Sequence, residues 1–410
     1  MSFALRLIII ILFLVLVEFY FVRKSIRSVK DLFPKISKKK IKSITVFGLI
    51  WLNLFPLATF TLWTYSRIAQ VERFTQPTSF FYEYLILYPF WFWILIVIQA
   101  FVILVPTEII KLILYIPFKK WRDKIRSYHH KFVFVVVVMV SVYVPARIIY
   151  DLNSVSTRIV EYKKAGLPKA LDGFRITFIS DVQADQFTTP ARLDDFINKV
   201  NDTHPDLVLV GGDIITGSVE YLGTSAEYLS KIKSPYGVYS CVGDHDNWMY
   251  GREYERSLHD VKHALDDVDV KMVDNDKVTI DVDTAKVRIT FITNTYVERI
   301  DSTTLDSLTN HSVGSDLKIF LTHQPREYLV DEAIAKNYDL MLAGHTHGGQ
   351  ITIFFPFYNL TPTLIETNFV KGDFWFDNML LVVNRGLGVS LSPIRYNSTP
   401  EITLIVVSSK

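Results

Sequence analysis

Long apolar runs fill most of the first 150 residues, and shorter apolar stretches separated by polar segments follow them. A helix needs roughly 20 apolar residues to cross a hydrocarbon core about 30 Å thick. Four runs meet this requirement: Ala4–Val22, Ile44–Tyr65, Tyr84–Val105 and Phe132–Tyr150. A fifth run, Thr107–Phe118, is too short and carries Glu108 and Lys111. We interpret it as an interfacial or re-entrant helix, with a fifth crossing as the alternative.

The loops between these runs differ in charge. Basic residues are concentrated in loops 23–43 and 106–131, whereas Arg67 and Arg73 are the only ones in loop 66–83. Because short basic loops stay in the cytoplasm, the first and third loops are expected inside. Four crossings then place the rest of the chain on the extracytoplasmic side, and a fifth crossing would reverse this.

From residue 174 onward, short apolar stretches alternate with amphipathic ones. The strand candidates are Phe174–Ser180, Leu207–Gly211, Gly237–Val242, Val287–Thr293, Leu317–Thr322 and Leu340–Ala343. The helix candidates are Pro190–Val200, Val219–Ile232, Glu253–Asp266 and Arg326–Lys336. This alternation predicts an α/β domain with a mixed or parallel sheet and helices outside it. We therefore expect a multi-pass transmembrane domain over 1–150, a linker over 151–171 and the α/β domain over 172–410.

Charge supports the same division. Residues 1–150 hold 20 Lys and Arg against 6 Asp and Glu, a difference of +14, and residues 151–410 hold 24 against 36, a difference of −12. Such asymmetry indicates two environments. The basic loops lie between apolar runs, so we do not expect a nucleic-acid partner. The single cysteine, Cys241, excludes a disulfide within the chain and a zinc site built from cysteines.

Polar side chains follow five of the predicted strands. They are Asp181 and Gln183, Asp213, the run Asp244, His245 and Asp246, then His323, and finally His345 and His347. Each alone has an ordinary explanation, since an Asp after a strand is often a helix cap and a lone His is usually structural. In open α/β sheets, however, ligands bind beyond the carboxyl ends of the strands. Together these residues predict one site.

The residue types suit a pair of divalent cations, which can clamp a phosphate and activate a water between them. Such a pair needs a bridging carboxylate and several oxygen and imidazole ligands. We expect Asp213 to bridge. Asp181 and His347 would hold one ion, and His323, His345 and Asp244 the other. His245, next to Asp246, would protonate the leaving oxygen as a general acid.

The order of these motifs resembles the calcineurin-like metallophosphoesterase superfamily. The run Leu342–Gln350 and the segment Asn384–Gly388, followed by Pro400–Ile402, are especially similar to its membrane-associated bacterial branch and to transmembrane proteins with this domain. The resemblance covers roughly residues 172–408. It implies a double β-sandwich flanked by helices, two metals such as manganese, iron, zinc or nickel, and the roles above.

Two residues depart from the family pattern. Gln183 stands where the family usually has His, and Asp244 where it usually has Asn. A glutamine oxygen can still ligate a hard cation, and the extra carboxylate adds negative charge at the second ion. Both residues therefore remain expected ligands.

The leading hypothesis is that a metal-bound hydroxide hydrolyses a phosphomonoester or phosphodiester at a membrane-tethered site. The aromatic segment Ile351–Phe376 could pack as a hairpin or form an apolar lip beside the metals. Such a lip would suit a phospholipid, a lipid pyrophosphate or a cell-envelope intermediate. Arg385 and Arg395 could contact phosphate or serve structure. The alternatives are a non-catalytic, metal-stabilised binding module and a transporter regulated by the domain. A transporter would need intramembrane charges, and the four runs contain few: Arg6 and Glu18 in the first and Arg147 near the end of the last.

Overall fold

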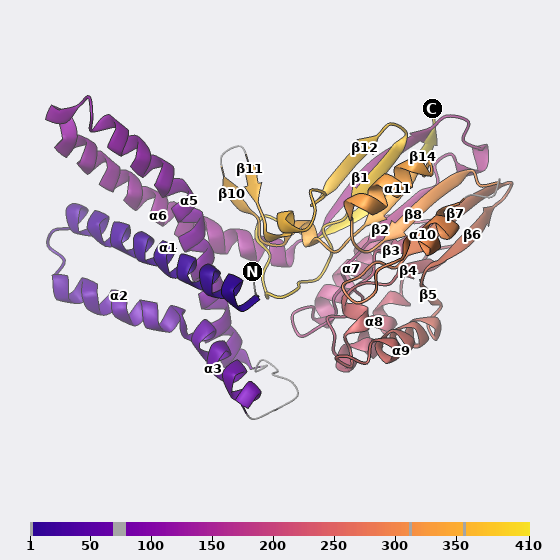
Figure 1. Ribbon diagram of the computed structural model, residues 1–410, viewed down its shortest axis with the longest axis horizontal. Helices are drawn as coiled ribbons and strands as arrows, with labels where there is room; N and C mark the ends of the chain where they lie inside the picture. The colour runs from indigo at the N-terminus through magenta and orange to yellow at the C-terminus, as the bar shows by residue number, and fades with distance from the viewer. Residues whose placement is uncertain (1–2, 69–78, 311–313, 356–357) are drawn as a thin grey trace. The chain divides into compact units, whose positions relative to one another are not determined.

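The computed structural model describes residues 3–68, 79–310, 314–355 and 358–410. Arg73 and Phe357 lie outside these ranges, and the side chain of Arg67 is also outside the described part. The chain divides into two compact units (Figure 1), one comprising residues 1–149 and 353–359 and the other residues 150–352 and 360–410. Each unit is described by itself below.

The first unit is mainly helical. Its elements are α1 (Phe3–Leu32), α2 (Lys38–Leu52), α3 (Leu54–Ile68), α4 (Phe80–Tyr82), the π-helical turn Glu83–Leu87, α5 (Tyr88–Leu114), α6 (Arg122–Asn153, whose last residues belong to the second unit) and the short strands β10 (Ile353–Phe355) and β11 (Tyr358–Leu360). Among the described residues, three helical segments are long and apolar enough to cross a membrane: Lys38–Leu62, Phe80–Leu114 and Lys119–Asn153. They overlap the second, third and fourth predicted runs. The first, Ala4–Val22, lies in α1, and some of its side chains are outside the described part. Four crossings therefore remain a prediction.

The expectation of a separate interfacial helix over Thr107–Phe118 is wrong. Helix α5 continues through Pro106 to Leu114, so most of this stretch extends the third span. A proline inside a helix frees one backbone hydrogen bond, and helices that cross membranes tolerate it because neighbouring groups compensate.

Two acidic side chains in the described part of the helical unit have polar partners. Glu18 accepts hydrogen bonds from the Asn53 amide at 2.9 Å and the Trp93 indole at 2.5 Å. Glu108 forms ion pairs with Lys24 and Lys111. Isolated charges are costly in a bilayer, and these contacts offset that cost. The pairing explains these residues structurally, so it does not favour the transporter hypothesis.

The β10–β11 pair belongs to this helical unit. The side chain of Gln99 in α5 donates to the Phe354 carbonyl at 2.8 Å and accepts from the Phe354 N–H at 3.1 Å. Gln99 is buried, whereas the rings of Phe354 and Tyr358 are more than half exposed. The hairpin thus satisfies a buried amide of an apolar helix and presents aromatic rings outward.

The second unit contains two six-stranded mixed sheets. The first has the order β1 (Ser156–Lys164), β14 (Glu401–Ser409), β2 (Arg175–Ile179), β3 (Leu207–Val210), β4 (Val238–Cys241), β5 (Val270–Val273). The second has the order β12 (Gly372–Phe376), β13 (Met379–Val383), β9 (Leu340–Ala343), β8 (Leu317–Thr322), β7 (Ala285–Ile292), β6 (Asp276–Val282). Strands β2, β3 and β4 are parallel, as are β7, β8 and β9. Parallel neighbours bring their carboxyl ends to one edge, where the predicted site residues begin.

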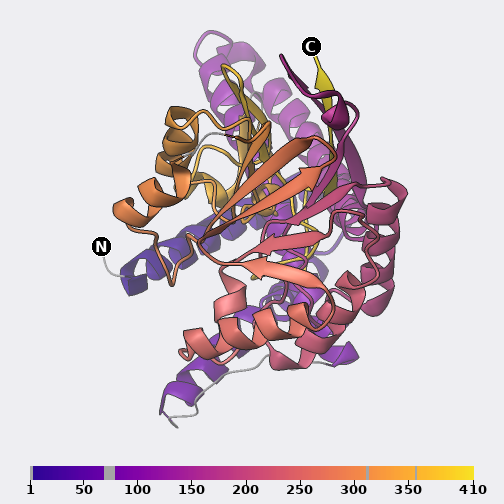
Figure 2. The same cartoon turned by 90° about the vertical axis from the view of Figure 1, so that its right-hand side faces the viewer.

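The sheets pack face to face. Leu209 in β3 and Ile319 in β8 lie in one buried cluster between the sheets, and Cys241 is buried there too. Neighbouring strand positions face outward: Val210 packs under α7 (Pro190–Asp202), α8 (Leu222–Leu229) and α9 (Tyr254–Asp266), and Phe320 under α10 (Ser302–Thr309) and α11 (Glu327–Ala335). Figure 2 shows the two helix groups on opposite sides of the strands. The predicted α/β sandwich flanked by helices is confirmed.

The aromatic segment 351–376 divides between two structural roles. Phe369, Phe374 and Phe376 pack against the core outside the second sheet, with β12 paired to β13. The β10–β11 aromatics instead belong to the helical unit. Part of the segment is therefore packed on the sandwich as a hairpin, and the apolar lip beside the metals remains a prediction.

Candidate metal centre

The predicted site residues all follow the carboxyl ends of strands in the second unit. Asp181 and Gln183 follow β2, Asp213 follows β3, the run 244–246 follows β4, His323 follows β8, and His345 and His347 follow β9. Several adopt a left-handed backbone, with φ of 49° at Asp181, 54° at Asp213 and 68° at His345. Non-glycine residues reach this region at a cost, and such strain concentrates at functional sites.

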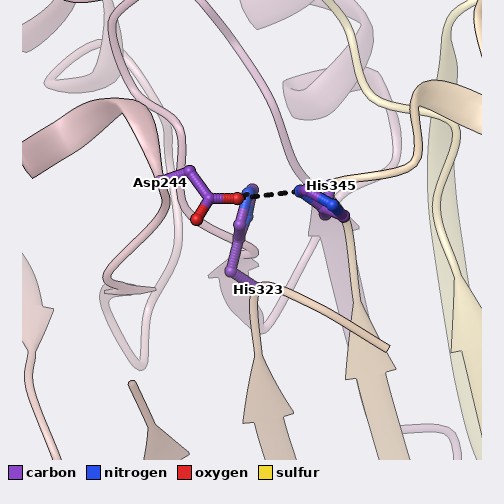
Figure 3. A group of neighbouring side chains, drawn as sticks. All are labelled: Asp244, His323 and His345. Atoms are coloured by element: carbon purple, nitrogen blue, oxygen red, sulfur yellow. Dashed lines mark ion pairs between the residues drawn. The ribbon is translucent and has the colours of Figure 1, made fainter. Parts of the chain in front are cut away.

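One group of ligand atoms comes from three loops. The His345 Nδ1 atom lies 2.9 Å from Asp244 Oδ2, and the His323 Nε2 atom lies 3.3 Å from the same oxygen. Figure 3 shows the two rings converging on the carboxylate. The donor atoms of Asp244, His323 and His345 lie within 4.8 Å of one another, which is close enough for one ion to contact all three.

A second group shares His323. Atoms of Asp181, Asp213 and His323 also lie within 4.8 Å of one another. The His323 Nδ1 atom lies 2.6 Å from the Gly211 carbonyl, which fixes the proton on Nδ1 and directs Nε2 toward the carboxylates. This Nε2 atom is buried and has no hydrogen-bond partner in the described structure. A buried, unsatisfied imidazole nitrogen facing two carboxylates suits a divalent cation.

The electrostatics agree with this fit. Burial opposes a charge on His323, but the carboxylates of Asp213 and Asp244 outweigh it and raise its pKa well above the usual value. Burial likewise opposes the ionised form of Asp213, yet the nearby imidazoles of His323 and His245 lower its pKa to about 2. The carboxylates of Asp213 and Asp244 therefore stabilise a positive charge at His323 Nε2. A metal cation bound there would take the place of the Nε2 proton.

Gln183 and His347 lie beside the second group. In the observed rotamer the Gln183 amide nitrogen donates to Asp213 Oδ2 at 2.9 Å, and its oxygen faces Thr216. The His347 Nε2 atom lies 3.4 Å from Asp181 Oδ1. Burial and the charge of Arg395 hold the pKa of His347 well below its ordinary value, so its ring is neutral. The Arg395 Nη2 atom lies 3.2 Å from the His347 Nδ1 atom. An arginine can only donate, which leaves the ring proton on Nε2, so His347 fits a ligand role less well than His323.

The sequence places Asp246 next to His245, but other groups orient the His245 ring. Its Nδ1 atom lies 2.8 Å from the Thr216 carbonyl, and its Nε2 atom lies 3.2 Å from the Ser390 hydroxyl. Asp246 instead accepts backbone N–H groups from Gly243, Asp213 and Ile214 at 2.8, 3.0 and 2.8 Å. The Asp246 carboxylate thus connects the turn after β3 with the turn after β4.

Three further residues contact the ligand groups and were not identified from the sequence. Glu366 Oε2 lies 3.1 Å from His345 Nε2, the Gln324 amide donates to both Asp244 oxygens, and the Tyr296 backbone N–H donates to Asp244 at 2.7 Å. Gln324 directly follows His323 in the chain, and this adjacency is the only sequence feature that points to any of the three residues. Glu366 lies in a segment that we interpreted through its aromatic residues.

The two arginines have structural contacts. Arg385 pairs with Glu401, and Arg395 is fully buried and donates to the carbonyls of Gly388, Arg385 and Ser398. Their guanidinium groups hold the loop after β13. These contacts agree with a structural role for both arginines, which was the alternative to phosphate binding.

Gly344 permits the turn after β9 to approach the first sheet. A Cβ atom there would lie 2.6 Å from Ser180 Cβ and 2.7 Å from Asp181 Oδ2. The absent side chain lets the His345 N–H reach the Asp181 carboxylate at 3.1 Å. This contact joins the two sheets at the site.

The sequence of the second unit is similar to known proteins. A family model described as calcineurin-like phosphoesterase matches residues 174–349. The uncharacterized metallophosphoesterase YkuE of Bacillus subtilis is 30% identical over 253 residues, which cover 60% of this chain and 83% of YkuE. A Danio rerio transmembrane protein with metallophosphoesterase domain is 26% identical over 258 residues, or 60% of this chain and 56% of that protein.

A third relative has a named reaction. The UDP-2,3-diacylglucosamine pyrophosphatase LpxG of Chlamydia muridarum is 27% identical over 294 residues, which cover 58% of this chain and 86% of LpxG. These similarities confirm the resemblance that the strand-end motifs indicated. The chain belongs to the calcineurin-like phosphoesterases, a family of metal-dependent hydrolases.

Proposed function

We propose that this protein hydrolyses a phosphomonoester or phosphodiester at a two-metal site tethered to a membrane. The observation that carries the proposal is the buried Nε2 atom of His323, which makes no hydrogen bond among the described residues and lies 3.4 Å from Asp213 Oδ2 and 3.3 Å from Asp244 Oδ2. Asp244, His323 and His345 would hold one cation. Asp181 and Asp213 would hold the other, with His347 and a reoriented Gln183 completing it and Asp213 as the bridge.

The bound cations would neutralise the phosphate charge and increase the acidity of a water molecule. Manganese, iron, zinc and nickel all accept mixed oxygen and imidazole ligands. The protein's own contribution is to hold the ligands through the Asp246 and Gln324 contacts.

His245 is the proposed proton donor to the leaving oxygen. The Thr216 carbonyl accepts from its Nδ1 atom, which directs Nε2 away from the turn and toward Ser390. An imidazole placed in this way can deliver a proton through Nε2 and recover it from solvent, because it is only partly buried. Asp246 assists by fixing the turns that carry His245 and Asp213.

A lipid-linked substrate is the preferred class. The hairpin 353–359 follows the His347 turn closely in sequence and packs with the apolar helices through Gln99. Its exposed aromatic rings suit an interface between water and lipid. LpxG, a relative that covers 58% of this chain, is named for a reaction on a diacylated substrate, which supports the same class. The basic loops place the catalytic unit on the extracytoplasmic side if the chain crosses four times.

The experiment compares hydrolysis of an aryl phosphodiester with added manganese by the full-length protein and by His245→Ala. We expect activity to fall by roughly 10²–10⁴-fold in the variant while its metal content stays unchanged. If no divalent cation supports hydrolysis by the wild type, the proposal fails, and the non-catalytic binding module becomes the better explanation.

A further inference from the structure

A cavity of about 400 Å³ lies next to the first ligand group, within the second unit. Its lining includes the polar and aromatic residues Tyr296, Arg299, Gln324, Arg326 and Glu366. The cavity is joined to the proposed metal ligands at two points. Gln324 donates to Asp244, and Glu366 reaches His345.

The Glu366 carboxylate occupies a set of oxyanion-binding groups. The Tyr296 hydroxyl donates to it at 2.6 Å, and the Arg326 Nη2 atom donates at 3.1 Å. The Glu366 side chain is 34% exposed, and its neighbour Ile365 is 90% exposed. An external anion could therefore displace this carboxylate without unfolding the core.

The remaining lining groups extend the same chemistry. Arg326 also donates to the Gln324 oxygen at 2.9 Å, which holds its guanidinium at the cavity wall. Arg299 adds a second guanidinium, and its side chain is exposed. Among the residues that line the cavity, Arg299 and Arg326 provide two positive charges and Glu366 one negative charge, and this positive excess increases when the Glu366 carboxylate moves away.

Guanidinium groups match phosphate oxygens in geometry as well as charge. A phosphate in this cavity would lie beside, and not on, the proposed metal ligands, because Asp244 and His345 form its border. The Tyr296 hydroxyl adds a donor without adding negative charge. The wall is thus suited to a second phosphate attached to the one that reacts.

We propose that this cavity binds the second phosphate of a diphosphate substrate, with Arg326 and Arg299 as its ligands and Glu366 as a displaceable internal anion. The inference rests on the proposed phosphoester hydrolysis and narrows its substrate class to phosphoanhydrides. In that reaction water oxygen bonds to one phosphorus and the bridging P–O bond breaks. The electron pair leaves with the second phosphate, and the water protons pass to the leaving oxygen and solvent.

The first test measures binding without catalysis. Inorganic pyrophosphate and inorganic phosphate are titrated separately into the full-length protein in chelator, with tryptophan fluorescence as the readout. The Trp248 ring stacks on the Tyr296 ring with 6.3 Å between the ring centroids, so its fluorescence should respond to changes at the cavity wall. We expect pyrophosphate to bind more tightly than phosphate, Arg326→Gln to weaken it by roughly 10–100-fold, and Glu366→Gln to strengthen it.

The matched control is Arg256→Gln, which removes an exposed guanidinium on α9 that does not line the cavity. It should leave both titrations unchanged. Equal affinity of the wild type for the two anions would overturn the proposal, as would equal losses in Arg326→Gln and Arg256→Gln.

The second test compares KM values for a diphosphate diester and an aryl phosphodiester in manganese. Arg326→Gln should raise KM for the diphosphate at least tenfold more than for the aryl diester. A parallel loss with both substrates would indicate that Arg326 only positions the site, and would refute the subsite. If the wild type hydrolyses neither substrate, the proposed function fails, and the pyrophosphate titration still decides whether the subsite exists.

Discussion

Replacing Asp246 by alanine tests whether this residue positions the site or takes part in the chemistry. The carboxylate is fully buried and accepts three backbone N–H groups, from Gly243, Asp213 and Ile214. Alanine would leave all three donors buried without a partner. Each unmade hydrogen bond costs about 1–3 kcal/mol, so the gross loss is about 3–9 kcal/mol.

Part of this loss is offset. Burial and the charge of Asp213 raise the pKa of Asp246 to about 6, which means that the ionised carboxylate destabilises the folded protein. Alanine removes this unfavourable charge. We therefore expect a net destabilisation of about 3 kcal/mol, at the low end of the range that the unmade hydrogen bonds give. For a unit of this size the unfolding midpoint should fall by roughly 6–12 °C.

The assay is thermal unfolding of the full-length protein in detergent, followed by tryptophan fluorescence in chelator. Asp195→Ala, which removes an exposed carboxylate on α7, is the control and should keep the wild-type midpoint. If Asp246→Ala also unfolds at the wild-type temperature while hydrolysis is lost, the positioning argument is refuted and Asp246 acts in the reaction.

Three further predictions concern the second unit. Gly344→Ala forces a Cβ atom against Ser180 and Asp181, so manganese affinity measured by calorimetry should fall at least tenfold; an unchanged affinity would show that the turn can move freely. Leu342→Ala empties a fully buried position between the sheets and should cost about 2–5 kcal/mol, seen as a lower unfolding midpoint, and a midpoint equal to that of the wild type would contradict the packing. Manganese at 100 times its Kd should stabilise the wild type by about 2.7 kcal/mol in the same thermal assay, and His323→Ala should lose most of this stabilisation. If manganese stabilises the variant as much as the wild type, His323 is not a metal ligand.

The strand-end donors could be predicted because topology, not detailed packing, brings them together. Parallel strands β2, β3 and β4 end at one edge, and β8 and β9 end at the facing edge of the second sheet. A polar residue directly after an apolar strand is visible in the sequence. The gathering of Asp181, Asp213 and His323 therefore follows from the strand order.

Contacts made by irregular segments could not be predicted in this way. Glu366 follows a short 3₁₀ helix and reaches His345 across 21 positions of chain. The position of Asp246 next to His245 in the sequence suggested a contact between the two side chains. The Asp246 carboxylate instead accepts hydrogen bonds from backbone N–H groups. In the helical unit, the charges of Glu108 and Lys111 suggested a separate interfacial segment, whereas α5 continues through them to Leu114. In each case the deciding interaction is tertiary and leaves no periodic pattern.

The metal content of the purified full-length protein tests the central claim most directly. After incubation with manganese and removal of excess ion, elemental analysis should find close to two ions per chain. Asp213→Asn, which weakens the bridging carboxylate, should retain fewer, and Asp195→Ala should match the wild type. Wild-type protein that is folded but retains no divalent metal under any loading condition would contradict the account.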